Sequence, residues 1–227
     1  KEQHAELWSK VMSGTDQLLT VAEHFKPLFE KTVEALCKDV TEELKKTMKD
    51  ASQDLSYDLV IGPLKDPVRV TEKAADDYAT RFVDLIAECN VVDVIRARLV
   101  CSSGTQMKDF LKKIAEDYET EIDGQKVKLT LARVKNKFSS KDSDPSRFRN
   151  VLLNLQLHSN AVTENGQTKY KNFHFVELQV HHKLILKFND DSHAHDFYDF
   201  FRRELASQYG KEMEASLNFM LEERMQL

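Results

Sequence analysis

The stretch VVDVIRARLV, residues 91–100, decides the expected fold, because it places charged side chains inside an otherwise apolar and β-branched run. Valine and isoleucine favour strands, and the Ser-Ser-Gly sequence at 102–104 bounds the run with residues typical of turns. A second run of this kind, FHFVELQV over residues 173–180, carries Glu177. The sequence therefore predicts two strands, far apart in the chain, each with a carboxylate in an apolar context.

Asp93 and Glu177 need an explanation, because an isolated carboxylate is costly to bury. Each must pair with a cation or lie at an opening where it can bind a metal ion. Magnesium prefers oxygen ligands, typically one or two carboxylates together with substrate phosphates, so the two carboxylates could converge on one ion. Alternatively, Asp93 pairs with Arg96, Arg98 or another buried cation, or it faces an exposed edge. The pattern leaves these alternatives open.

The segments around these two strands predict an α+β fold, with a mixed sheet of about five strands flanked by N- and C-terminal helices. Pro27 is expected to break the first helical region, because its ring removes an amide donor and disfavours helix before it. Asp66 or Thr71 is expected to cap the second helix. The expected helices cover residues 3–54, 66–88, 106–118 and 182–227, and the expected strands cover 57–61, 91–100, 127–131, 151–157 and 173–180.

Composition sets the class of protein. The chain has 227 residues, of which 41% are hydrophobic and 31% charged, a balance typical of a globular protein. With only 6 Gly and 4 Pro, long helices are favoured over a turn-rich barrel. No apolar run approaches the ~18 residues that span a bilayer, and no cationic-then-apolar start marks a secretory signal. Three widely spaced cysteines suggest free thiols, so we expect an intracellular protein, in the cytosol or an organelle lumen, that is not secreted.

Charge is concentrated in one segment. The net charge is −5, yet residues 124–150 carry eight Lys and Arg against two Asp. A cationic cluster inside an acidic protein can hold phosphates through charge-assisted hydrogen bonds. A solvated strand face explains the same pattern.

A second cationic group follows Gly62. Lys65, Arg69 and Lys73 recur at intervals of four, which puts all three on one face if the stretch is helical. A cationic face beside a helix start could grip a triphosphate, although a solvated helix face is the simpler interpretation. The glycine pattern of a Walker A loop is missing.

The order of these features resembles the synthetase domain of the RelA/SpoT family, and most closely its divergent protist-type members. The resemblance covers roughly Tyr57 to Leu205 and includes the strings DVIRARLVC, VKNKF and VELQV. It implies a nucleotidyltransferase-like fold, with residues 1–56 as a helical region packing on the sheet, 57–205 as the core and 206–227 as a C-terminal helix. Active members move pyrophosphate from ATP to the 3′-hydroxyl of GDP or GTP, and some relatives modify adenine nucleotides or the tRNA 3′ end.

The resemblance assigns the donor side of the site. The family's GRxK turn corresponds to residues 62–65, so Lys65 and Lys73 would hold ATP phosphates, with Arg69 nearby. The DxxxxR strand corresponds to residues 93–98, which makes Asp93 a magnesium ligand and adds Arg98 to the phosphate-binding residues. The ExQ strand is Glu177 to Gln179, with Glu177 as the second metal ligand or the base near the acceptor hydroxyl. The catalytic residues that the resemblance implies are thus Asp93, Glu177 and Gln179.

The resemblance also implies an acceptor side, and it leaves a second hypothesis open. The family's basic KDYI string looks like residues 135–138, and its GYxS string matches 147–150 loosely. Lys135, Lys137 and Arg149 would then bind the acceptor, and Phe148 would stack on its base. Pro63, Arg147 and the His181-His182 pair depart from the family pattern. The alternative is a catalytically degenerate RelA/SpoT-fold binding module or a subunit of a larger assembly, whose N-terminal helices dock a protein partner rather than only covering the sheet.

Overall fold

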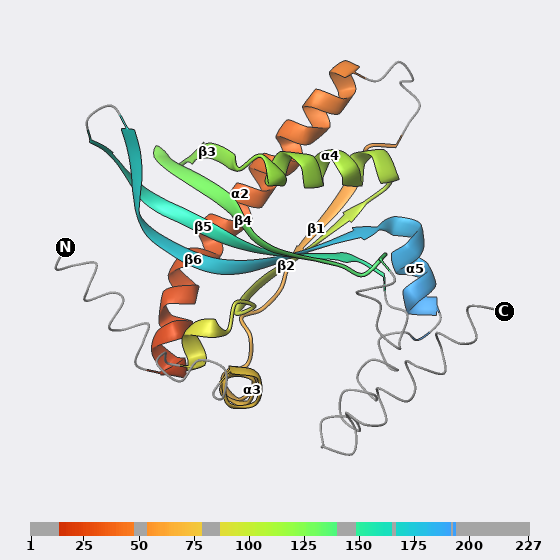
Figure 1. Cartoon of the computed structure of the whole chain (residues 1–227). Coiled ribbons are helices and arrows are strands. Elements are labelled where there is room, and N and C mark those ends of the chain that lie inside the picture. Colours follow the sequence, from red (N-terminus) through yellow and green to blue (C-terminus); the bar gives the residue numbers. More distant parts are fainter. Residues whose placement is uncertain are drawn as a thin grey trace.

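The computed structural model describes residues 14–47, 54–78, 87–139, 149–164, 167–191 and 193. They form one sheet of six strands in the order β1-β2-β6-β5-β4-β3, flanked by helices (Figure 1). The strands are β1 (Tyr57–Ile61), β2 (Ile95–Cys101), β3 (Tyr118–Ile122), β4 (Gln125–Asn136), β5 (Val151–Glu164) and β6 (Gln167–His182). The helices are α2 (Thr15–Thr47), α3 (Pro67–Lys73), α4 (Gly104–Ala115) and α5 (Lys183–Asp191), with a π-helical turn at Ala74–Tyr78 and a 3₁₀ turn at Ala87–Asn90. The predicted α+β class is confirmed, with β3 as one strand more than expected.

The sheet is mixed because β2 and β6 run parallel, whereas all other neighbouring strands are antiparallel. In that parallel pair, Ile95 lies beside Val176 and Arg96 beside Glu177. The two strands that the sequence singles out are therefore direct neighbours. Their pairing brings the segment around Asp93 close to Glu177.

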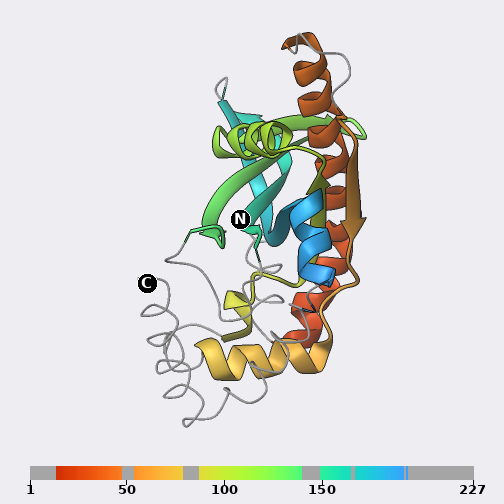
Figure 2. The same cartoon turned by 90° about the vertical axis from the view of Figure 1, so that its right-hand side faces the viewer.

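Helices α2 and α4 cover one face of the sheet (Figure 2). Alternate residues point to opposite faces of a strand, and the residues on the covered face are apolar. Ile95, Leu99 and Leu178 are fully buried there, together with Phe29 of α2 and Phe110 of α4. The side of the sheet away from α2 and α4 is called the open face below.

The expected break at Pro27 is wrong, because α2 continues through it from Thr15 to Thr47. Phe25 and Phe29 are buried on either side of Pro27, and Pro27 itself is exposed. The proline removes one helical hydrogen bond. The apolar face of α2 is continuous against the sheet, and its burial holds both halves of the helix in line.

The predicted cap at Asp66 is confirmed. Asp66 Oδ1 accepts hydrogen bonds from the amides of Val68 at 2.9 Å and Arg69 at 3.3 Å, and Pro67 occupies the first helical turn. The regular helix ends earlier than expected, at Lys73. The expected helical residues 79–86 and 194–227 lie outside the described residues. None of the described helices is long and apolar enough to cross a bilayer.

Candidate functional site

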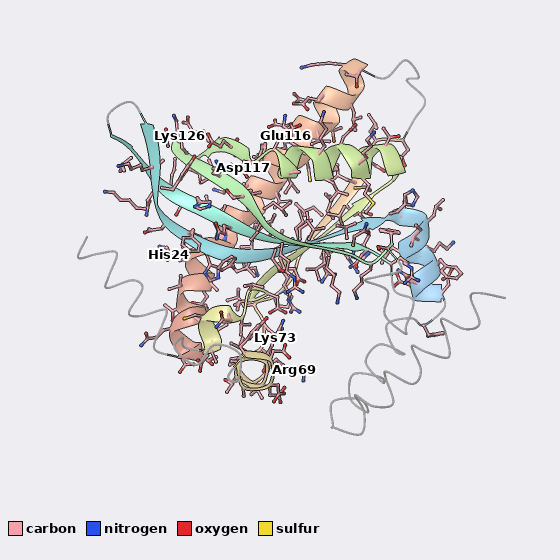
Figure 3. All side chains as sticks on the ribbon, in the orientation of Figure 1. His24, Arg69, Lys73, Glu116, Asp117 and Lys126 are labelled. Carbon is pink, nitrogen blue, oxygen red and sulfur yellow. The ribbon has the colours of Figure 1, made fainter. Side chains whose placement is uncertain are left out.

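A cluster of one carboxylate and two amines lies just before β2, where Asp93 precedes the strand rather than lying inside it as expected. Asp93 Oδ2 accepts hydrogen bonds from Lys65 Nζ at 2.6 Å and from Lys73 Nζ at 2.9 Å. Asp93 is 8% exposed, and the side chains of Lys65 and Lys73 are 14% and 28% exposed. Lys73 at the end of α3 points back towards the sheet (Figure 3), but Lys65 precedes the helix, so the expected single helical face of Lys65, Arg69 and Lys73 does not form.

The turn after β1 holds Lys65 in this position. The amide of Gly62 donates to the carbonyl of Arg96 at 2.9 Å, and the amide of Lys65 donates to the carbonyl of Val94 at 3.0 Å. These bonds continue the β1–β2 ladder beyond the last residues of β1. A Cβ atom at position 62 would lie 3.4 Å from the carbonyl oxygen of Arg96, so glycine suits this close approach.

The charges of this cluster stabilise one another. Burial would raise the pKa of Asp93, but the charges and hydrogen bonds of Lys73 and Lys65 outweigh it and hold that pKa below its ordinary value. Burial also opposes the charge of Lys73, yet Asp93 raises the pKa of that amine overall. For the less exposed Lys65, the loss of hydration dominates and lowers the pKa. Asp93 is therefore an ionised carboxylate with two cationic partners.

Glu177 lies on the open face of β6, beside Arg96 in register, and is 6% exposed. Its Oε1 accepts a hydrogen bond from Gln179 Nε2 at 2.7 Å. Burial raises the pKa of Glu177; the bond from Gln179 opposes this, and the nearby charge of Asp93 raises the pKa further. Lys73 and Arg96 also act on it electrostatically, in the opposite sense. Asp93 and Glu177 are therefore close enough for their charges to interact.

The open face continues this site across four strands. Side chains of directly paired residues share a face of the sheet, so the register defines rows perpendicular to the strands. One row consists of Arg96, Glu177, Asn154 and Arg133, and the next consists of Arg98, Gln179, Leu152 and Lys135. At about 4.8 Å per strand, a row from β2 to β4 spans about 14 Å. The β4 part of the predicted basic segment thus forms one side of a surface that has Glu177 at its centre.

Two features of the described residues fit a magnesium ion. Asp93 Oδ1 is buried and has no hydrogen-bond partner. Glu177 is a buried carboxylate whose ionised form is disfavoured in the absence of a further cation. Within the described part of the chain no three His, Cys, Asp or Glu side chains form a metal-binding group. Two carboxylates with the remaining positions taken by phosphate and water is an arrangement typical of Mg²⁺.

The structure brings some of the predicted site residues together and leaves others apart. Lys65, Lys73, Asp93, Glu177 and Gln179 form the cluster just described. Arg69 instead bonds to Glu72 at 2.9 Å on the half-exposed side of α3 (Figure 3).

The remaining predicted residues lie further along the sheet or beyond its described part. Arg98 and Lys135 stand one row further from Asp93, on either side of Gln179. Lys137 follows β4, and its amide donates to the carbonyl of Asn150 at 3.0 Å. The carbonyl of Arg149 accepts from Asn189 Nδ2 at 3.4 Å. Phe148 lies outside the described residues.

Three residues of the row around Glu177 were not assigned a site role from the sequence. Arg96 was considered only as a partner for Asp93, yet its charge acts on Glu177 and Lys65. Asn154 is 4% exposed and lies directly beside Glu177, and Arg133 is next to Asn154. The alternation of β2 gives the signal for Arg96, because it shares a strand face with Arg98. The positions of Asn154 and Arg133 depend on register.

Several solved structures are similar to this chain. The small alarmone synthetase 1 from Bacillus subtilis bound to its product pppGpp is 15% identical, with a TM-score of 0.44 over 91% of this chain and 99% of that one. A GTP pyrophosphokinase family protein from Streptococcus pneumoniae is 14% identical, with a TM-score of 0.48 over 91% of each chain. The small alarmone synthetase 2 from Bacillus subtilis is 15% identical, with a TM-score of 0.44 over 89% of this chain and 95% of that one.

These proteins are of the class that the sequence motifs resemble, and at such identities the likeness concerns the fold alone. No protein-family model and no curated protein matches the sequence.

Proposed function

We propose that this chain is a magnesium-dependent pyrophosphokinase, which transfers pyrophosphate from ATP to a hydroxyl of an acceptor. The acceptor is a nucleotide of the GDP or GTP kind or the end of an RNA. The observation that supports this best is the meeting of Asp93 and Glu177, from distant parts of the sequence, beside Lys65, Lys73 and Arg96. The proposal rests on this geometry together with the motif order of the sequence.

The donor triphosphate binds at the lysine cluster in this proposal. Lys73 and Lys65 lie on one oxygen of Asp93, and phosphate oxygens offer them additional charge-assisted bonds. Arg96 adds a third cation beside Glu177, and Arg98 follows in the next row. Asp93 and Glu177 would hold the magnesium ion, whose charge stabilises the negative charge of the phosphates when it is bound.

The acceptor binds on the β6–β4 side of Glu177. Its hydroxyl oxygen attacks the β-phosphorus of ATP, the bond from that phosphorus to the oxygen of AMP breaks, and AMP leaves. Where Glu177 serves as the base instead of as the second metal ligand, its remaining oxygen takes the proton of the hydroxyl, for which a raised carboxylate pKa is suitable. Gln179 fixes one oxygen of Glu177 and leaves the other available.

Lys135, Lys137 and Arg149 would neutralise acceptor phosphates, and Phe148 would stack on the base. Positioning and electrostatics supply most of the acceleration.

Label transfer tests the proposal. The full chain is incubated with Mg²⁺, ATP labelled at the γ-phosphate and a panel of GDP, GTP, adenine nucleotides and tRNA. We expect label in one acceptor together with release of AMP. Glu177→Gln should lower the rate at least a hundredfold, whereas the matched surface variant Glu72→Gln should leave it unchanged. An equal rate in the Glu177→Gln variant would contradict the assignment.

One observation favours the second candidate, a binding module without activity. The two lysines already neutralise Asp93, and this pairing accounts for its burial without a metal ion. The module binds ATP without transferring label, or binds neither ATP nor Mg²⁺. A thermal-shift titration with ATP, with and without Mg²⁺, separates these cases. A shift without transfer in the whole panel would favour the module that keeps a phosphate pocket.

A further inference from the structure

The strand β1 forms one edge of the sheet, and its character differs from that of the opposite edge. Natural proteins protect sheet edges with charged side chains or short strands. The other edge strand, β3, has the sequence YETEI with exposed Glu119 and Glu121. The edge strand β1 has the sequence YDLVI, and Val60 is 47% exposed. The β1 edge therefore carries a single exposed charge, Asp58, together with an exposed valine, whereas β3 carries two exposed charges.

The register shows which main-chain groups of β1 face outward. Gly62 donates its amide to the carbonyl of Arg96, and amide direction alternates along a strand. In the antiparallel β1–β2 pair, Asp58 and Val60 therefore direct their amide and carbonyl groups towards β2. Tyr57, Leu59 and Ile61 direct theirs away from the sheet. No bond between these outward groups and another described segment occurs in the structure.

A groove of about 550 Å³ runs beside this edge, between β1–β2 and α5. Val60, Val100 and Leu186 give it an apolar floor. Its rim is charged with both signs, because one face of α5 presents two lysines near its start and two aspartates at its end. The charged lining residues are Asp58, Arg98, Lys183, Lys187, Asp190 and Asp191.

We propose that this groove binds an extended peptide segment of another protein, which adds to β1 as a seventh strand. Outward amides and carbonyls at every second residue match the main chain of another strand. The apolar floor accepts an aliphatic side chain of the peptide. The rim selects charged neighbours of both signs, with acidic residues towards Lys183 and Lys187 and basic residues towards Asp190 and Asp191.

The chemistry of the rim disfavours a second phosphate ligand here. Three carboxylates face the same groove as the three cations, so a polyanion would meet repulsion as well as attraction. The groove also lies towards the opposite end of β2 from Asp93. At about 3.3 Å per residue, Val100 is about 23 Å from Asp93 along the chain. The groove shares Arg98 with the row beside the proposed phosphate site, whereas its other lining residues belong to β1, to Val100 and to α5.

Selection from a phage-displayed library of random seven-residue peptides, with the full chain immobilised, tests the proposal. We expect enriched peptides with an aliphatic residue flanked by charged residues. A synthetic, fluorescently labelled copy of the best peptide should lose at least tenfold in affinity to the Leu186→Asp variant. The matched variant Leu184→Asp changes a residue on the same helix that is 71% exposed and outside the groove, and it should bind within twofold of the unchanged protein.

Two further measurements guard against a folding artefact. The peptide has two alternating sets of amides, and strand addition requires that only one set bonds to β1. N-methylation of that set should weaken binding at least tenfold, and N-methylation of the other set should have little effect. Lys187→Glu should weaken an acidic peptide and be rescued by a peptide with the corresponding charge reversed. The proposal is overturned if no peptide is enriched, or if N-methylation of either set of amides has the same effect. It is also overturned if light scattering shows a dimer that Leu186→Asp dissociates, because the groove would then pair with a second copy.

Discussion

At the scale of single residues, Asp93 pairs with cations, which is one of the explanations that its sequence context left open. One oxygen is taken by Lys65 and Lys73, and the other is buried without a partner. The sequence suggested Arg96, Arg98 or another buried cation as the partner, and the structure has the last of these. The actual partners come from the turn after β1 and from α3, because the bonds of Gly62 and Lys65 to β2 set where those side chains reach.

Substituting Asp93 should change stability as well as activity. Asp93→Asn removes the charge and leaves two poorly exposed ammonium groups without their counter-ion. We expect the free energy of unfolding at pH 7 to fall by about 1–3 kcal/mol in urea titrations. Glu72→Gln breaks a half-exposed pair with Arg69 and should cost less than about 0.5 kcal/mol. Equal stability of the two variants would show that the lysines turn to solvent without loss.

At the scale of elements, α2 shows how tertiary packing overrides a local signal. Pro27 predicts a break, but α2 runs for 33 residues past it. At the turn between β3 and β4, by contrast, local sequence decides the structure, because Asp123 and Gly124 adopt positive φ, 51° and 76°, which these residue types tolerate. The strand β3 was missed, because its alternating glutamates and threonine follow a helix-like segment directly. The helix α4 ends at Ala115, and Asp117 turns the chain with φ 60°.

Replacement of the proline should stabilise α2. Pro27→Ala restores an amide donor towards the carbonyl of Glu23, and the exposed position loses no packing. We expect the free energy of unfolding to rise by about 1–3 kcal/mol, with a higher Tm. Glu30→Ala, at an exposed position of the same helix, is the control and should change it by less than about 0.5 kcal/mol. An unchanged or lowered Tm would mean that the proline shapes the helix to fit the sheet.

At the scale of the whole molecule, the core contains an imidazole between α2 and the sheet. His174 is 6% exposed and stacks on Phe25, with ring centroids 5.4 Å apart. Burial lowers the pKa of His174 to about 4. The unfolded chain binds a proton near the ordinary value of about 6.5, so this contribution to stability is complete above pH 6.5 and is lost as the pH falls towards 4.

The pH dependence of unfolding therefore should respond to this side chain. His174→Phe keeps a planar ring beside Phe25 and removes the titrating group. Between pH 7 and pH 5 the loss of stability should shrink by about 2 kcal/mol relative to the unchanged protein, measured by urea titration at each pH. His24→Phe, at an exposed position of α2, should leave the pH dependence as it is. If the free energy of unfolding changed equally with pH in all three proteins, a group other than His174 would cause the acid sensitivity.

More of the fold than of the candidate site could be predicted from the sequence. The strands at 57–61 and 173–180 were predictable, because alternation of apolar and polar side chains is a local property. Glu177 and Gln179 share a face for the same reason. The partners of Asp93 and the row from Arg96 to Arg133 were not predictable, because they depend on register across strands and on the path of a turn.

The parallel pairing of β2 with β6 also sets the order in which these strands can pair during synthesis on the ribosome. The paired residues are roughly eighty positions apart. At a synthesis rate of about 5–20 residues per second, β6 is therefore made roughly 4–16 s after β2. During that interval the nascent chain can form the antiparallel β1–β2 ladder, while the side of β2 that will receive β6 stays open. A chaperone that shields apolar strands would bind the nascent chain at this stage, before β6 pairs with β2 and places Glu177 beside Arg96.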